Sequence, residues 1–168
     1  MLQFLKLGGS LITDKRHPRA AKAEVIARLM DEIRRAREDL PQMQLLIGHG
    51  SGSFGHVPAK RYGTRSGVRS KEDWRGFVEV WRQARDLNNL ILEAARTASL
   101  PVIAFPPSAF IHAKGGRVHS INTDPLKSAL AAGLIPMVNG DVVFDHDLGG
   151  TIFSTEDVFA AIAADILP

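Results

Sequence analysis

Two short apolar segments of this chain each run directly into a glycine-rich segment, and this pairing constrains the fold more than any other feature. Residues Leu2–Leu7 are followed by Gly8–Ser10, and Leu45–Ile47 is followed by the segment Gly48–His56. Short apolar runs that end at glycine are typical of buried strands. In a parallel sheet, the loops after such strands meet at one carboxyl edge, where ligands bind. The sequence therefore predicts an α/β fold with two glycine-rich loops on the same edge.

Both glycine-rich segments suit the binding of an anion such as phosphate. Backbone without side chains can approach an anion closely and turn its N–H groups toward it. Lys6 and Lys15 lie on either side of the first segment, where they can neutralise negative charge. His49 and His56 flank the second segment and can donate hydrogen bonds to phosphate oxygens. An ordinary surface turn is the alternative, because glycine and serine are common loop residues.

The rest of the chain alternates helical and strand patterns. Apolar side chains at helical spacing predict helices over residues 21–38 and 73–98, and the second carries more apolar surface than one buried face needs. That helix could serve the core, a subunit contact and an apolar ligand pocket. Further predicted elements are strands over 101–105 and 135–138, hairpins around Gly115-Gly116 and between 142–145 and 150–153, and helices over 122–132 and 158–166. The alternation predicts a three-layer αβα sandwich with a mainly parallel sheet, as one domain over residues 1–168.

Charge and composition narrow the class of partner. The net charge of +3 suits anionic substrates, but no basic stripe is interleaved with aromatic residues as single-stranded nucleic acid prefers, so no nucleic acid is expected. The basic segment 58–71 is expected to be irregular, either as a mobile cover over an anionic ligand or as a solvated loop. No apolar run approaches the ~20 residues of a membrane span, and no signal peptide is recognisable, so a cytoplasmic protein without a membrane partner is expected.

The absence of three sequence features limits the chemistry. The sequence has no cysteine, which excludes disulfides and thiolate metal sites. Its six histidines form no His-x-x-x-His pair on a helix, so no metal ligands are expected. Ser51 and Ser53 lack the hydrolase context of a strand-elbow Gly-x-Ser-x-Gly motif. Glycine loops, lysines and histidines around anionic oxygens remain, and they fit phosphoryl transfer, which needs mainly positioning and charge neutralisation.

The motifs also resemble a known family. Lys6–Ser10 and His49–His56 resemble the two glycine-rich motifs of the amino acid kinase superfamily. Within it, Pro107–Phe110, Gly140–Val143 and Ser154–Asp157 are similar to motifs of isopentenyl phosphate kinases, and the resemblance covers essentially the whole chain. It implies ATP-dependent phosphorylation of isopentenyl phosphate to isopentenyl diphosphate in an alternate mevalonate route of isoprenoid biosynthesis, with ATP and Mg²⁺ as cofactors.

The resemblance implies a role for individual positions. Lys6 would stabilise the transferring phosphoryl group, assisted by Lys15, and His56 would grip the acceptor phosphate and orient its oxygen. The ATP phosphates would be held by Lys6, Gly8, Gly9, Ser10 and Gly52. The acceptor would be bound by Gly50, Ser51, Gly55, His56 and Gly140, with Phe77, Val80 and, more weakly, Val138 lining a pocket for its tail. Ser51 stands where relatives often carry glycine or alanine, and this difference is expected to be tolerated.

Relatives continue into a second half that carries most of the adenosine site. The sequence stops at Pro168, where the next strand should begin, so the C-terminal nucleotide half is expected to be missing and full kinase activity is not expected. An edge left uncovered would favour association, and a homodimer is expected. Three alternatives stay open: an enzyme similar to fosfomycin kinase, a phosphate-binding module without turnover, and an inactive fragment.

Overall fold

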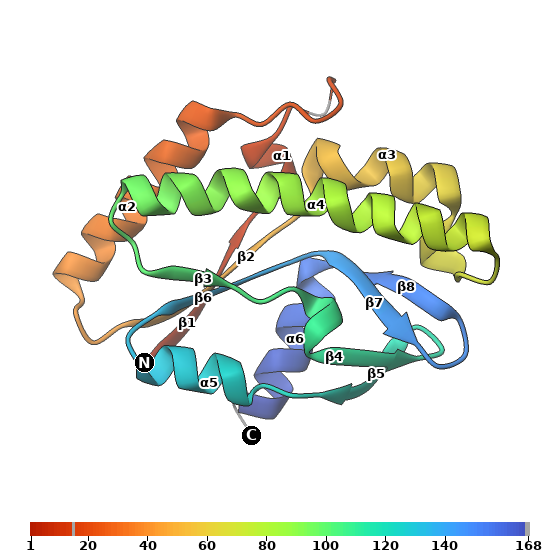
Figure 1. Ribbon diagram of the computed structural model, residues 1–168. Coiled ribbons are helices and arrows are strands. Elements are labelled where there is room, and N and C mark those ends of the chain that lie inside the picture. The colour runs from red at the N-terminus through yellow and green to blue at the C-terminus, as the bar shows by residue number, and fades with distance from the viewer. Residues whose placement is uncertain (15, 167–168) are drawn as a thin grey trace.

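A four-stranded parallel sheet forms the centre of the computed structural model, which describes residues 1–14 and 16–166 (Figure 1). Its order is β1-β2-β6-β3, and every neighbouring pair is parallel. The strands are β1 (Leu2–Leu7), β2 (Gln44–His49), β3 (Val102–Ala104) and β6 (Ile135–Asn139). The apolar runs of β2 and β6 are buried throughout their cores, because helices cover both faces of this sheet. The predicted mainly parallel sheet is confirmed.

Helices lie on both faces of the sheet, which gives the predicted three layers. On one face α2 (Ala23–Asp39) and α4 (Lys71–Thr97) pack against side chains such as Ile47 and Met137. On the other face α5 (Asp124–Ala131) and α6 (Thr155–Ile166) pack against Leu46 and Val138. Leu46 and Ile47 thus enter different cores, because neighbouring side chains of a strand point to opposite faces. Figure 1 shows these two helical layers above and below the sheet.

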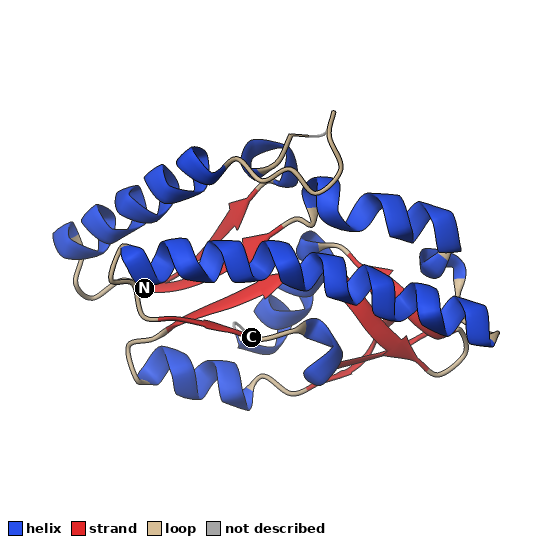
Figure 2. Cartoon of the chain, turned by 45° about the horizontal axis from the view of Figure 1, so that its top comes forward, coloured by secondary structure: helices blue, strands red, loops and turns tan. Residues whose placement is uncertain are grey.

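A second, mixed sheet was not predicted as a sheet, although its two hairpins were. Its order is β5-β4-β7-β8, with β4 and β7 parallel and the two outer pairs antiparallel. The strands are β4 (Ile111–Lys114), β5 (Arg117–Ile121), β7 (Asp141–Asp145) and β8 (Gly149–Phe153). The chain passes from β6 to β7 with Gly140 alone between them, so the two sheets meet at this point. Figure 2 shows the long α4 lying across both sheets.

The predicted loop 48–56 is not a continuous loop. Gly48 and His49 are the last residues of β2, where they pair with Val138 and Asn139 of β6. A two-residue turn follows, and α3 (Gly52–Tyr62) begins at once. The first glycine segment likewise runs into a short helix, α1 (Gly9–Ile12). The glycines therefore lie where strands end and helices begin.

The basic segment 58–71 is also more regular than predicted. Its first residues complete α3, which includes Pro58, and a 3-10 helix η1 (Thr64–Ser66) follows. A second 3-10 helix, η2 (Pro107–Ala109), precedes β4. Pro58 is the seventh residue of α3, and proline is usually disfavoured inside a helix because it lacks an N–H donor. Among the described helices, none combines the length and the apolar composition that crossing a membrane requires.

Candidate active site

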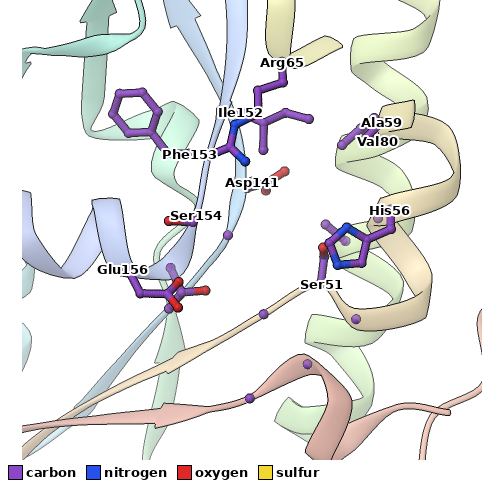
Figure 3. A pocket seen from close by; sticks show the side chains of 18 of the residues that line it. Ser51, His56, Ala59, Arg65, Val80, Asp141, Ile152, Phe153, Ser154 and Glu156 are labelled. Atoms are coloured by element: carbon purple, nitrogen blue, oxygen red, sulfur yellow. The ribbon is translucent and has the colours of Figure 1, made fainter. Parts of the chain in front are cut away.

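A cavity of about 560 Å³ opens where β1, β2 and β6 end and β7 begins. This is the carboxyl edge of the parallel sheet, where open α/β folds bind ligands. Figure 3 shows Ser51 and His56 on one side of the cavity and Ser154 and Glu156 on another. The cavity is lined by most of the positions named from the sequence: Lys6, Gly8, Gly9, Ser10, Gly50, Ser51, Gly52, Gly55, His56, Val80 and Gly140.

The two glycine segments touch each other through their backbones. A Cβ atom on Gly9 would lie 2.8 Å from the Cα atom of Gly52, and one on Gly50 would lie 3.1 Å from the Gly9 nitrogen. The Thr13 hydroxyl joins the same segments, because it donates to the Gly9 carbonyl at 2.6 Å and accepts from the Ser53 N–H at 3.0 Å. Glycine at these positions is therefore required by packing, before any ligand is considered.

Two helices begin at the cavity wall. Gly52 opens α3, and Thr155 opens α6, and both residues line the cavity. The first N–H groups of a helix have no partner within it and carry partial positive charge, which favours an anion. At α6 the Ser154 hydroxyl and the Asp157 carboxylate cap the helix reciprocally. The backbone of the site thus supplies positive potential in addition to the basic side chains.

Lys6 lines the cavity and is paired with Glu156. The Lys6 ammonium group donates a hydrogen bond to the Glu156 carboxylate, and both side chains are partly exposed. This hydrogen bond lowers the pKa of Glu156 below its ordinary value. Lys6 is the last-but-one residue of β1, so the strand directs its side chain to the carboxyl edge. The pairing holds a cation beside both glycine segments.

A basic face of α3 extends the site beyond the predicted residues. His56 and Lys60 lie four residues apart on this helix and both line the cavity. Arg65 of η1 also lines it, and its guanidinium Nη2 atom lies 3.7 Å from the Asp157 carboxylate Oδ2 atom. Sequence reasoning did not assign Lys60 or Arg65, because it treated 58–71 as irregular. If residues 52–62 are recognised as a helix, the four-residue spacing of His56 and Lys60 predicts that both lie on the same helical face.

Apolar side chains also line the cavity, and they differ in part from the predicted ones. Val80 lines the cavity as expected, together with Ala59, Ala84 and Ile152. Phe77 does not line it: the side chain is 6% exposed and packs in a core cluster with Val68, Val80 and Val142. Phe77 lies one turn before Val80 on α4, and there the second sheet covers the helix, with Phe144 at a ring-centroid distance of 5.3 Å.

One further predicted position, Val138, does not line the cavity. Val138 is fully buried in the core on the α5 and α6 face, beside Leu46. Its burial follows from its central position in β6, which is covered by helices on that face. Lys15, predicted to neutralise charge on the transferring group, lies outside the described residues.

His49 was expected to donate to an anion, and this was wrong. Its side chain is 0% exposed, with Nε2 at 3.1 Å from Asn88 Oδ1 and Nδ1 at 3.3 Å from the Gly50 carbonyl oxygen. Burial lowers the pKa of His49 below its ordinary value, although both contacts favour the charged form. The His49 carbonyl accepts from the Thr155 hydroxyl and from the Gly140 N–H. His49 therefore ties together the elements that form the cavity.

We expect His49 to make the stability of the protein depend on pH. The folded state favours the neutral ring, whereas an unfolded chain protonates histidine near pH 6.5. The stabilisation is therefore present above about pH 6.5 and is lost as pH falls toward the lowered folded pKa. In urea titrations, the difference in unfolding free energy between the wild type and His49→Gln should shrink by up to about 1.4 kcal/mol per pH unit below that value.

The wild type is compared with a variant because Asp141 makes the stability of the protein depend on pH in the opposite direction. Burial raises the pKa of Asp141 to about 7, so the folded state holds a proton that the unfolded state releases. Subtracting His49→Gln from the wild type removes this shared contribution. If the difference in unfolding free energy between the wild type and His49→Gln stays constant from pH 8 to pH 5, the expectation is contradicted.

The parallel sheet and the glycine-lined cavity at its carboxyl edge define an α/β class of protein whose ligand site lies at this edge. Residues 1–166 match the sequence model of the amino acid kinase family, and the chain belongs to this family. The relatives that it matches carry a more particular name. The chain is 31% identical to the isopentenyl phosphate kinase of Methanocaldococcus jannaschii over 175 residues, and 37% identical to that of Methanothermobacter thermautotrophicus over 150 residues.

A solved structure agrees with these sequence matches. The fold superposes on an isopentenyl phosphate kinase described by X-ray structures with a TM-score of 0.89 at 33% identity, covering 100% of this chain and 69% of that one. The curated relatives are longer: the chain is covered to 99% and 86% but spans 65% and 54% of their lengths. The family and the fold expected from the sequence are thus confirmed.

Proposed function

We propose that the protein phosphorylates isopentenyl phosphate with ATP to give isopentenyl diphosphate. The observation that carries this proposal is that one cavity combines two kinds of lining. Lys6, the two glycine turns and His56 suit an anion, whereas Ala59, Val80, Ala84 and Ile152 are apolar. An alkyl phosphate needs both an anion site and an apolar slot. The names of the relatives support the same acceptor.

The arrangement suits in-line phosphoryl transfer. We propose that the backbone of Gly8–Ser10 and Gly52 holds the nucleotide phosphates beside Lys6, whose charge stabilises the transferring group. Gly50, Ser51, Gly55 and Gly140 would enclose the acceptor phosphate, with His56 directing its attacking oxygen. Such catalysis relies on positioning and charge neutralisation rather than on covalent chemistry by the protein. Lys15 remains part of the proposal as a second cation.

Mg²⁺ is proposed to enter with the nucleotide. Magnesium is usually bound through one or two protein carboxylates and the phosphates of the substrate. Glu156 lines the cavity and is paired with Lys6, which is a suitable place for such a carboxylate. Within the described ranges, no group of three or more histidine, aspartate or glutamate side chains could hold a metal ion without the nucleotide. Bound magnesium would supply charge neutralisation between the phosphates.

Association into a homodimer is also part of the proposal. Trp74 and Val78 lie one turn apart on α4 and are exposed, and the exposed Phe144 of β7 has a ring-centroid distance of 6.1 Å to Trp74. Contiguous exposed apolar side chains of this kind are typical of protein contacts. A second copy of the chain would cover them.

The function is tested by binding and turnover of defined acceptors. The 168-residue chain is mixed with isopentenyl phosphate, and its thermal unfolding is followed, with fosfomycin and inorganic phosphate in parallel. With Mg²⁺ and ATP present, ³¹P NMR then follows formation of a diphosphate. We expect isopentenyl phosphate to raise the unfolding temperature more than inorganic phosphate does, because only the ester fills the apolar slot. A shift with fosfomycin but none with isopentenyl phosphate would overturn the assignment.

A further inference from the structure

Asp141 is a buried acid in the cavity to which phosphoryl transfer assigns no role. It is the first residue of β7, is 3% exposed and lines the cavity beside Gly140. Figure 3 shows its carboxyl group directed into the cavity on the side of Ile152. Carboxyl groups are almost never buried to this degree without partners, because loss of water costs free energy.

The protein itself satisfies only part of this carboxyl group. Oδ1 accepts a hydrogen bond from the Val142 N–H at 2.7 Å, while Asn139 and the more distant Arg85 stabilise the charged form. Burial outweighs these effects and raises the pKa of Asp141 to about 7. A carboxyl group offers about four acceptor positions. The Asp141 carboxyl group can therefore form further hydrogen bonds on the side that faces the cavity.

Apolar side chains share the cavity with Asp141, and the basic Arg65 of η1 lies beside one of them, Ile152 (Figure 3). Val80 and Ala84 of α4 and Ile152 of β8 line the cavity with Asp141. A wholly hydrocarbon tail in this slot would displace water from the carboxyl group and give it no hydrogen bond in return. A tail with a hydroxyl group would replace that water with a direct hydrogen bond. The slot therefore distinguishes the two kinds of tail.

We propose that Asp141 is a specificity-determining residue that binds a hydroxyl group on the carbon chain of the acceptor, so that hydroxylated short-chain alkyl monophosphates are acceptors in addition to isopentenyl phosphate. This inference rests on the proposed function, since it places the acceptor phosphate at His56 and the carbon chain along α4. A site that hydrogen-bonds a substrate hydroxyl discriminates strongly against the analogue without it, because its own polar group is then left unpaired.

The test compares two acceptors of similar size on three forms of the protein. Dissociation constants of isopentenyl phosphate and of 3-hydroxy-3-methylbutyl phosphate are measured by titration calorimetry with the 168-residue chain, Asp141→Leu and Asp147→Asn. Asp147 lies in the exposed turn between β7 and β8, so Asp147→Asn controls for loss of a carboxylate outside the cavity. We expect the wild type and Asp147→Asn to bind the hydroxylated ester about tenfold more tightly, and Asp141→Leu to reverse that preference.

Each outcome separates this inference from the proposed function. If both esters bind but Asp141→Leu leaves the ratio of their dissociation constants unchanged, Asp141 does not bind the tail and the inference is overturned, while the function stands. If the hydroxylated ester alone binds and the preference is lost in Asp141→Leu, the inference holds and isopentenyl phosphate is the wrong acceptor. Binding of neither ester overturns both. Should Asp141→Leu fail to fold, Asp141→Ala removes the same hydrogen-bonding group without filling the slot.

Discussion

Replacing His56 with alanine in a catalytically active form of the protein is expected to lower turnover of isopentenyl phosphate by about 100-fold, because misplacement of a reacting group by about 1 Å already costs that much. His56 lies in the first turns of α3, faces the cavity, and is the one histidine among the described residues that line it. Its partner in the proposed reaction is the acceptor phosphate, so affinity for the acceptor should fall as well. Steady-state rates and calorimetric titration with isopentenyl phosphate measure the two effects.

The control for this substitution is His119→Ala. His119 lies in β5 of the second sheet and does not line the cavity, so rates and affinity should match the wild type. Loss of turnover in His56→Ala with unchanged acceptor affinity would assign His56 to the transition state alone. Near-normal rates would remove His56 from the proposed mechanism altogether.

Gly52→Ala should be among the most destabilising single substitutions, with a loss of about 3 kcal/mol in unfolding free energy. Gly52 has a φ of +51°, a left-handed conformation that is strained for alanine. Its added Cβ would also lie 2.2 Å from the Thr13 hydroxyl oxygen and 2.9 Å from the Gly9 carbonyl oxygen. The contact between the two glycine turns would have to open, so phosphate affinity should fall with stability.

Gly63→Ala separates the cost of the strained backbone conformation from the cost of the steric contacts made by the added Cβ atom. Gly63 has a φ of +60° at the end of α3, and an added Cβ there meets nothing within 4 Å. Conformational strain alone should cost about 1 kcal/mol. Urea unfolding of both variants therefore measures the packing contribution as their difference. Equal losses in the two variants would show that contact between the glycine turns contributes nothing measurable.

Local patterns explain which elements could be predicted. The apolar runs of β1 and β2 end at glycine, and the helical stripe of α2 and α4 repeats over many residues, so their existence and order followed from the sequence. The segment 58–62 was misjudged, because Pro58 and a run of basic residues resemble a loop locally, whereas packing of α3 against α4 maintains the helix. Tertiary contacts commonly override local preference in this way.

The candidate site shows the same limit. Lys6, the glycine turns and His56 were predicted to meet because strands of a parallel sheet bring their following segments to one edge, and they line one cavity. Whether a side chain in such a motif faces the cavity or the core depends on which distant elements pack against it. His49 is buried beside Asn88, and Phe77 is buried in a cluster with Val142. Arg65, in contrast, lines the cavity.

The sequence by itself determined the alternation of strands and helices, the family, and the two glycine turns that approach an anion, since these depend on residue type and spacing along the chain. Only the tertiary structure decided that β7 begins one residue after β6 and carries Asp141 into the cavity wall. It also decided that His49 is buried and hydrogen-bonded to the elements around the cavity, and is not a ligand-binding group. The physical reason is that burial depends on what packs across the sheet from distant parts of the chain, and burial in turn sets the charge and the availability of each side chain.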